Sequence, residues 1–371
     1  MSLIRKGILA SGGAVSCSLI GVAVNIILSR GLLPEGMGKY QVPCTASVLI
    51  ATIFSLGIGQ SNIYFLNKHK IETQKIVMNT IWFGFFSSSV IFVSMPTIFH
   101  IFSHYFGHMR PFTSIIFSLG TGALLCFNLL RPVLTAELNI TKDVIAKIVN
   151  KLSYFLIITF ALILNYLSVD SALIGLSCSY IVALVLILFF LKKHIHFNVP
   201  FSWQIFKSTL KYGLQLFLAN FVYIVNVSVG LLLIRYLIPG NFTKIGYYGR
   251  AVSICGLIML IPISIGPLLY AQWSNLKMDK MGSQVELTMR LHILAGIITI
   301  IFLAIFGTFI IKILYGEEYL PAVGTMRILS FGVVCRCVFN VCNNMLASVG
   351  KPNIVTMLLS LCMLLVVFLT F

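Results

Sequence analysis

The segment RGLLPEGMGKY, Arg30–Tyr40, joins two long apolar runs near the start of the chain, and a second copy of it occurs farther along. The second copy is RYLIPGNFTKIGYY, Arg235–Tyr248. The Arg, Leu and Pro residues match at an offset of 205, and the Gly, Lys and Tyr residues align after a short insertion. A weaker match relates residues 134–142 to residues 345–351. Such a repeat indicates two halves built on one plan.

Apolar runs long enough to cross a membrane surround both copies. A helix needs about 20 apolar residues to span the hydrocarbon core. Eleven runs are candidates: 8–28, 42–64, 77–99, 112–138, 148–167, 171–191, 210–234, 248–270, 289–312, 322–346 and 353–371. Six runs separate the two copies, so both halves have the same orientation and the repeat is parallel. The sequence predicts an all-α, polytopic membrane helix bundle, with about eleven spans visible of a twelve-span, two-lobe transporter.

The repeat also predicts how the chain divides. We expect an N-terminal lobe of six helices at 1–195, a cytoplasmic linker at 196–209, and a C-terminal lobe of five helices at 210–371. The run at 171–191 has no counterpart in the second half, so the last helix of the plan is missing. We therefore expect either a short C-terminal lobe or a truncated product of a twelve-span parent.

The composition excludes a soluble enzyme. Hydrophobic residues make up 59% of the chain and charged residues only 9%, whereas a soluble domain carries about 25% charged residues. Lys and Arg number 26 against nine Asp and Glu, a net charge of +17. The basic residues are scattered between apolar runs rather than gathered in a basic domain, which argues against a nucleic-acid partner. They point to anionic lipids, to membrane orientation and to an anionic substrate.

Loop charges predict the orientation. With the N-terminus inside, most Lys and Arg residues lie on the inner side, among them Lys142, Lys147 and Lys151 around the start of the run at 148–167. The positive-inside rule then places the N-terminus in the cytoplasm.

Polar residues within the runs are the candidate substrate contacts, because charged and amide groups are costly in a membrane. In the fourth run, Asn128 and Arg131 share a helical face, and in the tenth run Arg336, Asn340 and Asn343 do the same. The two Arg residues are 205 positions apart, the offset of the repeat.

Two further candidates are Asn25, on a polar stripe of the first run, and Arg250, at the start of the eighth. Small polar residues on membrane helices also serve to join helices, and Arg131 lies near enough to the inner surface to extend its charge into the interface. The sequence leaves both interpretations open.

No motif predicts catalysis, a metal or a cofactor. The chain lacks a nucleophile elbow, a phosphate loop, an HExxH motif and paired carboxylates. His100, His104 and His108 are spaced on one helical face, but no carboxylate or Cys accompanies them, so an interfacial segment is the better interpretation. The nine Cys residues lie in apolar stretches without metal-ligand spacing. We expect a protein that is not an enzyme, with no catalytic residue and no bound metal.

The chain resembles the Wzx-type O-antigen translocases of the polysaccharide transporter family, in the superfamily of the MATE exporters. The matching segments are 29–40, 210–215, 245–248, 314–322 and 345–351. The resemblance implies alternating access by two six-helix bundles, which carry an undecaprenyl-pyrophosphate-linked oligosaccharide from the inner to the outer leaflet of the bacterial cytoplasmic membrane. It implies that Arg131, Arg250 and Arg336 neutralise the pyrophosphate in a cationic cavity, and it implies a polysaccharide polymerase and a chain-length regulator as partners. The missing twelfth helix departs from the family pattern.

Two other functions remain in view. One is a MATE-like exporter of cationic drugs driven by Na⁺ or H⁺, a mechanism that needs buried carboxylates, whereas no acidic residue lies at the middle of an expected span. The other is an inactive, truncated membrane fragment, which the missing span favours and the paired Arg stripes oppose.

Overall fold

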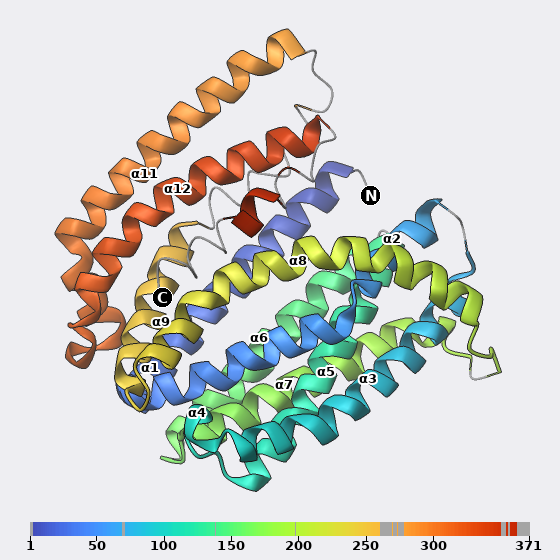
Figure 1. Ribbon diagram of the computed structural model, residues 1–371, viewed down its shortest axis with the longest axis horizontal. Helices are drawn as coiled ribbons and strands as arrows, with labels where there is room; N and C mark the ends of the chain where they lie inside the picture. The colour runs from blue at the N-terminus through green and yellow to red at the C-terminus, as the bar shows by residue number, and fades with distance from the viewer. Residues whose placement is uncertain are drawn as a thin grey trace. The chain divides into compact units, whose positions relative to one another are not determined.

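The structure is a computed structural model that describes residues 3–68, 71–137, 139–196, 198–259, 269, 273, 278–349, 354 and 357–361. These residues form helices joined by short turns, without a strand (Figure 1). Eight of the described helices are long and apolar enough to cross a membrane. Helices suit that environment because they satisfy their backbone hydrogen bonds internally. The all-α membrane bundle expected from the sequence is confirmed.

The first helix, α1 (Leu3–Ser55), contains the first expected span and the first part of the second, 42–64, and it breaks between the two. Leu33 has φ 58° and ψ 174°, a conformation outside the helical region. The residue before a proline is disfavoured in the α conformation, and Pro34 follows directly, so the repeated segment itself causes the break. A second break, at Leu56 and Gly57, separates α1 from α2 (Ile58–Lys68).

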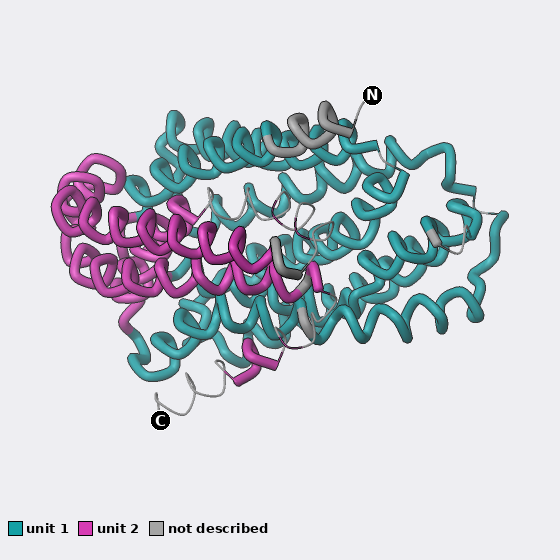
Figure 2. Tube along the Cα trace, turned by 90° about the horizontal axis from the view of Figure 1, so that it is seen from above, with its two compact units in different colours: residues 1–32, 39–240 teal, residues 33–38, 241–371 magenta. Residues whose placement is uncertain are grey.

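The chain forms two compact units, coloured separately in Figure 2. Unit 1 comprises residues 1–32 and 39–240. After α2 it contains α3 (Thr73–Ile101), α4 (Ser103–Phe106), α5 (Pro111–Ala136), α6 (Ile140–Ile163), α7 (Val169–Leu191), the short η1 (Lys192–His194) and α8 (Trp203–Leu237). Helix α5 is central, since it packs against α2, α3, α6 and α7. Small residues allow this: a Cβ on Gly120 would lie 2.4 Å from the Ser177 side chain of α7.

Helix α8 is fixed to unit 1 near both ends. Near its start, the Asn79 side chain of α3 exchanges two hydrogen bonds with the Ser202 backbone, at 2.8 and 2.9 Å. Near its end, the buried Arg235 donates to the backbone carbonyls of His104 and Tyr105. The division into lobes at 195 and 210 stays a prediction, and α8 packs with unit 1 in this structure.

Unit 2 comprises residues 33–38 and 241–371, and it brings the two copies of the repeat together. It contains α9 (Phe242–Ile258), α11 (Met278–Tyr315), η2 (Glu317–Tyr319) and α12 (Ala322–Ser348). A Cβ on Gly38 would lie 2.0 Å from the Phe242 carbonyl oxygen, and one on Gly246 would lie 2.0 Å from the Pro34 carbonyl oxygen. The backbones of the two copies touch at these glycines, which explains why both copies contain glycine.

The turn between α11 and α12 closes unit 2 at one end. Lys312 and Glu317 form an ion pair at 2.6 Å, and the hydrogen bond from the ammonium holds the pKa of the Glu317 carboxyl below its ordinary value. Tyr319 is fully buried and packs its ring against Tyr315 and Tyr247. These contacts account for the segment 314–322 that carries part of the resemblance.

The remaining expected spans agree with helices. The run at 248–270 begins inside α9, and its later residues, 260–268, lie outside the described residues. Most of the run at 353–371 lies outside them as well. Several helices begin before the predicted runs. Helix α11 begins at Met278, eleven residues before the 289–312 run, α6 begins at Ile140, eight residues before the 148–167 run, and α8 begins at Trp203, seven residues before the 210–234 run.

Candidate functional site

Unit 1 contains a partly open cavity of about 200 Å³ with polar lining residues, here called the polar cavity, between α1, α6 and α7. Its lining residues are Gly21, Val24, Asn25, Leu28, Tyr40, Cys44, Ser47 and Val48 of α1, Lys151 and Tyr154 of α6, and Leu176 and Tyr180 of α7. All three helices are candidate membrane spans. The cavity therefore presents polar side chains inside a membrane bundle, where such groups are costly unless they are used.

Hydrogen bonds fix the second half of α1 against its neighbours. The Tyr40 and Tyr154 hydroxyls lie 2.8 Å apart, and the Tyr154 hydroxyl also donates to the Ala172 carbonyl at 3.3 Å. Ser47 and Thr121 share a hydrogen bond of 2.9 Å between α1 and α5. These side chains hold the cavity wall in place, so they are structural members of the site.

Three other polar groups of the lining have no protein partner among the described residues. They are the Asn25 side-chain amide, the Lys151 ammonium and the Tyr180 hydroxyl. Asn25 and Tyr180 are half-buried and Lys151 is exposed, so all three polar groups are accessible to a ligand or to water and can form hydrogen bonds with it. Asn25, Lys151 and Tyr180 come from three different helices, and we name them the polar triad.

Lys151 is the charged member of the polar triad, and its position was missed in the sequence. It lies eleven residues into α6, about 16 Å from the start of the helix at 1.5 Å per residue. The predicted run began at 148, so Lys151 was counted with the inner-side charges. Asn150 and Tyr154, close to Lys151 in an otherwise apolar stretch, are the signal that could have revealed it.

The chemistry of the cavity suits an anion or a sugar. The ammonium and the hydroxyl donate hydrogen bonds, while the Asn25 amide both donates and accepts. None of the lining residues is acidic. Typical small-molecule sites measure about 300–1,000 Å³, so this cavity can take a phosphate group or one sugar ring rather than an oligosaccharide.

Among the residues predicted from sequence, only Asn25 lines this cavity. Arg131, near the end of α5, places Nε 3.2 Å from Asp143 Oδ1, and Lys147 Nζ lies 2.5 Å from the other carboxylate oxygen. The two cations thus share one buried carboxylate. Asn128 is exposed on the same helix.

The other predicted residues lie in unit 2. Arg250 is buried in α9, with its guanidinium 5.5 Å from the Tyr315 ring centroid. Arg336 is exposed on α12, and Asn340 and Asn343 are half-buried on the same helix. The structure therefore places Arg336 near both Asn residues along one helix, and it places Arg250 in a packed environment. Whether these residues bind substrate stays a prediction.

Comparisons with known proteins agree with this architecture. Residues 27–324 match the family described as polysaccharide biosynthesis protein. A Shigella flexneri protein named "Putative O-antigen transporter" is 22% identical, over 96% of this chain and 88% of its own length.

Solved structures of similar fold are transporters. A multidrug resistance MATE family transporter of the MOP superfamily in an inward-facing conformation has a TM-score of 0.69 at 15% identity, covering 92% of this chain and 83% of its own. A MOP superfamily transporter from Pyrococcus furiosus, described as having a binding pocket of reverse polarity, has a TM-score of 0.67 at 14% identity, covering 96% and 84%. With a family match over well more than half of its length, the chain belongs to the family of polysaccharide biosynthesis proteins and has the fold of the MOP superfamily transporters.

Proposed function

We propose that this protein is a flippase that moves an undecaprenyl-pyrophosphate-linked oligosaccharide from the inner to the outer leaflet by alternating access. The observation that carries the proposal is the polar triad: an amide, an ammonium and a hydroxyl, without partners among the residues that the structure describes, inside a bundle of membrane helices. The family match and the name of the Shigella relative support a polysaccharide substrate.

The physical problem that such a substrate poses matches the chemistry of the cavity. A pyrophosphate cannot enter hydrocarbon without compensation for its lost hydration. The Lys151 ammonium supplies one opposite charge, and the Asn25 and Tyr180 side chains supply hydrogen bonds to phosphate or sugar oxygens. Since the cavity measures about 200 Å³, it holds the linkage or one sugar at a time.

The Arg and Asn residues predicted from sequence complete the proposed path. We assign Arg336, Arg250 and Arg131, with Asn340, Asn343 and Asn128, as further contacts along the route of the anionic head group. The protein acts in the bacterial cytoplasmic membrane with its N-terminus in the cytoplasm. A polymerase and a chain-length regulator then act on the product at the outer leaflet.

The charge of the cavity weighs against export of cationic drugs. A cation-coupled exporter needs a carboxylate in its binding cavity, and the cavity described here has a lysine instead. An ammonium repels a cationic drug and attracts an anion. The observation therefore favours the flippase over the exporter.

The test is a gene deletion combined with a measurement of which leaflet holds the lipid-linked oligosaccharide. The proposal predicts loss of surface polysaccharide, accumulation of the intermediate on the inner leaflet, and restoration by the 371-residue chain. Unchanged surface polysaccharide with altered drug sensitivity would contradict it and favour the exporter. Loss that this chain does not restore, although the chain is inserted, would indicate an inactive fragment.

A further inference from the structure

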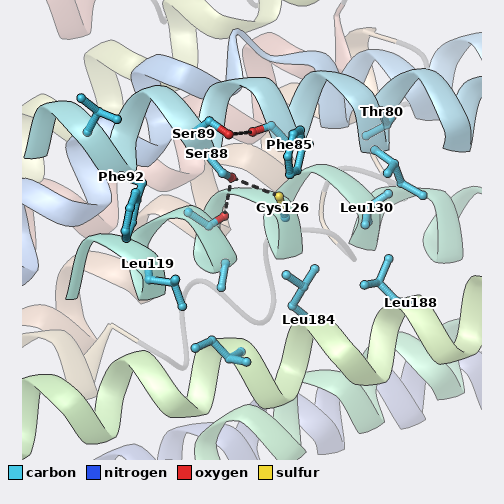
Figure 3. A pocket seen from close by; sticks show the side chains of 15 residues that line it. Thr80, Phe85, Ser88, Ser89, Phe92, Leu119, Cys126, Leu130, Leu184 and Leu188 are labelled. Atoms are coloured by element: carbon cyan, nitrogen blue, oxygen red, sulfur yellow. Dashed lines mark hydrogen bonds between the residues drawn. The ribbon is translucent and has the colours of Figure 1, made fainter. Parts of the chain in front are cut away.

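An apolar groove of about 500 Å³ runs along α3, α5 and α7 in unit 1 (Figure 3). Phe85 and Phe92 of α3, Leu119 of α5, and Leu184 and Leu188 of α7 are among its lining residues. Phe85, Phe92 and Leu119 are 41–67% exposed, so the groove opens on the surface of unit 1. It is separate from the polar cavity, and none of the residues predicted from sequence lines it.

The few polar side chains of the groove are already satisfied by the protein. Thr80 Oγ1 donates to the Ile76 carbonyl at 2.7 Å and accepts from Asn62 at 2.9 Å. Ser88 Oγ donates to the Gly122 carbonyl at 3.1 Å, and Ser89 Oγ donates to the Phe85 carbonyl at 2.9 Å. These hydroxyls therefore have no hydrogen left to donate to a ligand, and the rest of the lining is apolar, which favours hydrocarbon.

The length of the groove indicates which hydrocarbon. Its lining residues extend from Thr80 to Val93 along α3, a rise of about 20 Å. One leaflet of the hydrocarbon core is about 15 Å thick, half of the full core. A phospholipid acyl chain spans only its own leaflet and is therefore too short to fill the groove. A hydrocarbon chain that fills the groove must be longer than one leaflet is thick.

One end of the groove is basic. Leu188 lines the groove, and Lys192 and Lys193 follow one turn later in η1, which packs against α3 and α7. Neither lysine has a carboxylate partner among the described residues, and Lys192 Nζ lies 4.7 Å from the Phe189 ring centroid. The carboxylates of Glu72, directly before α3, and Glu137, directly after α5, are paired with Lys75 and His194, at 3.0 and 2.9 Å. Two ammonium groups thus remain to attract an anionic head group.

We propose that this groove binds the long isoprenoid chain of the polyprenyl-pyrophosphate substrate, with the pyrophosphate at Lys192 and Lys193 when the lipid first docks. The inference rests on the proposed function and adds the site at which the lipid part is held. The groove keeps the chain in an apolar environment while the head group moves through the polar cavity. Because the groove holds the isoprenoid chain, the cavity needs to accommodate only the head group.

The experiment uses the purified full chain in nanodiscs and undecaprenyl pyrophosphate with a diazirine in its terminal isoprene units. Cross-linked peptides are mapped for the unmodified protein, for Val93→Trp and for Val90→Trp. Val93 lines the groove, whereas Val90, on the same helix and also exposed, does not. We expect cross-links in α3, α5 and α7. Val93→Trp, which displaces about two methylene groups of the bound chain, lowers cross-linking about tenfold, and Val90→Trp leaves it unchanged.

Competition identifies the occupant, and a flipping assay on the same samples separates the two proposals. Excess undecaprenyl phosphate abolishes the cross-links, whereas excess phosphatidylglycerol does not. Equal competition by phosphatidylglycerol, or cross-links at another place with flipping intact, would overturn the groove assignment and leave the flippase standing. Absence of both flipping and cross-linking in the unmodified protein would overturn the proposed function together with the groove.

Discussion

The two hollows of unit 1 lie on different sides of one helix and have opposite chemistry. On α7, Tyr180 lines the polar cavity, while its neighbour Ile181 lines the apolar groove. Successive residues of a helix point about 100° apart, so a single helix contributes to both. In the cavity three polar groups have no protein partner within the described part of the chain, whereas in the groove the hydroxyls of Thr80, Ser88 and Ser89 all donate to backbone carbonyls. We infer from this difference that hydrogen-bonding groups without protein partners, rather than polar residues as such, indicate where a polar head group binds.

The largest effect on flipping is expected from a substitution that makes the polar cavity apolar, like the groove. Lys151→Met removes the ammonium and preserves the volume, and we predict a loss of flipping of about 100-fold, the value of a charge-assisted contact of about 3 kcal/mol. Because an unpaired charge in a membrane is costly, the thermal stability of the variant in detergent should not fall. The measurement is surface polysaccharide in the deletion strain together with Tm.

Lys147→Met is the matched control for this variant. Lys147 lies one helical turn before Lys151 and pairs with Asp143 at 2.5 Å. We expect lower stability with little change in flipping. An equal loss of flipping in both variants, or no loss for Lys151→Met, would contradict the assignment of Lys151.

A second variant tests whether the cavity of unit 1 acts alone. Arg336 lies on α12 of unit 2 and is exposed. We predict that Arg336→Ala lowers flipping about 10- to 100-fold with normal membrane insertion, and that Arg336→Lys recovers only part because it lacks the bidentate guanidinium. Full activity of Arg336→Ala would confine the anion path to the residues of unit 1.

Two tyrosines of the cavity sharpen the comparison on a smaller scale. The Tyr180 hydroxyl has no partner among the described residues, whereas the Tyr154 hydroxyl contacts Tyr40 and Ala172. Tyr180→Phe should slow flipping about fivefold, the value of a hydrogen bond of about 1 kcal/mol, without a change in stability. Tyr154→Phe should lower the free energy of unfolding by about 1 kcal/mol. A stability loss for Tyr180→Phe would mean that its hydroxyl serves packing.

The smallest effect is expected in the groove. Ser88 Oγ lies 3.1 Å from the Gly122 carbonyl oxygen and 3.3 Å from Cys126 Sγ, and it joins α3 to α5. Hydrogen bonds between membrane helices contribute about 0.6 kcal/mol on average, so Ser88→Ala should lower stability by about that amount and leave flipping unchanged. A clear loss of flipping at unchanged stability would show that the hydroxyl contacts substrate.

The overall architecture was largely predictable from the sequence. Apolar runs of about 20 residues predict membrane helices, and the matching Arg, Leu and Pro residues of the two repeated segments predict two related halves. The structure adds the reason for the glycines, since Gly38 and Gly246 lie where the backbones of the two copies touch. These contacts join segments more than 200 residues apart in the sequence, so a local sequence pattern could not predict them.

The site was predictable only in part. The polar stripe of the first run pointed to Asn25, which does line the cavity. Lys151 was missed because the predicted span was placed by hydropathy alone. The first turns of α6 contain polar residues, so the predicted span began at 148 and Lys151 was assigned to the membrane surface. The pairing of Arg131 with Asp143 joins two helices, so spacing along one helix could not reveal it.

The most direct test reconstitutes the unmodified chain in liposomes with undecaprenyl-pyrophosphate-linked oligosaccharide in both leaflets. The rate at which inner-leaflet sugar becomes accessible to an added glycosidase is compared with protein-free vesicles and with the Lys151→Met variant. The account predicts movement with the unmodified chain and movement near the protein-free rate with the variant. Movement at the same rate with and without Lys151, or no movement with correctly inserted protein, would contradict the claim that the polar triad carries the head group.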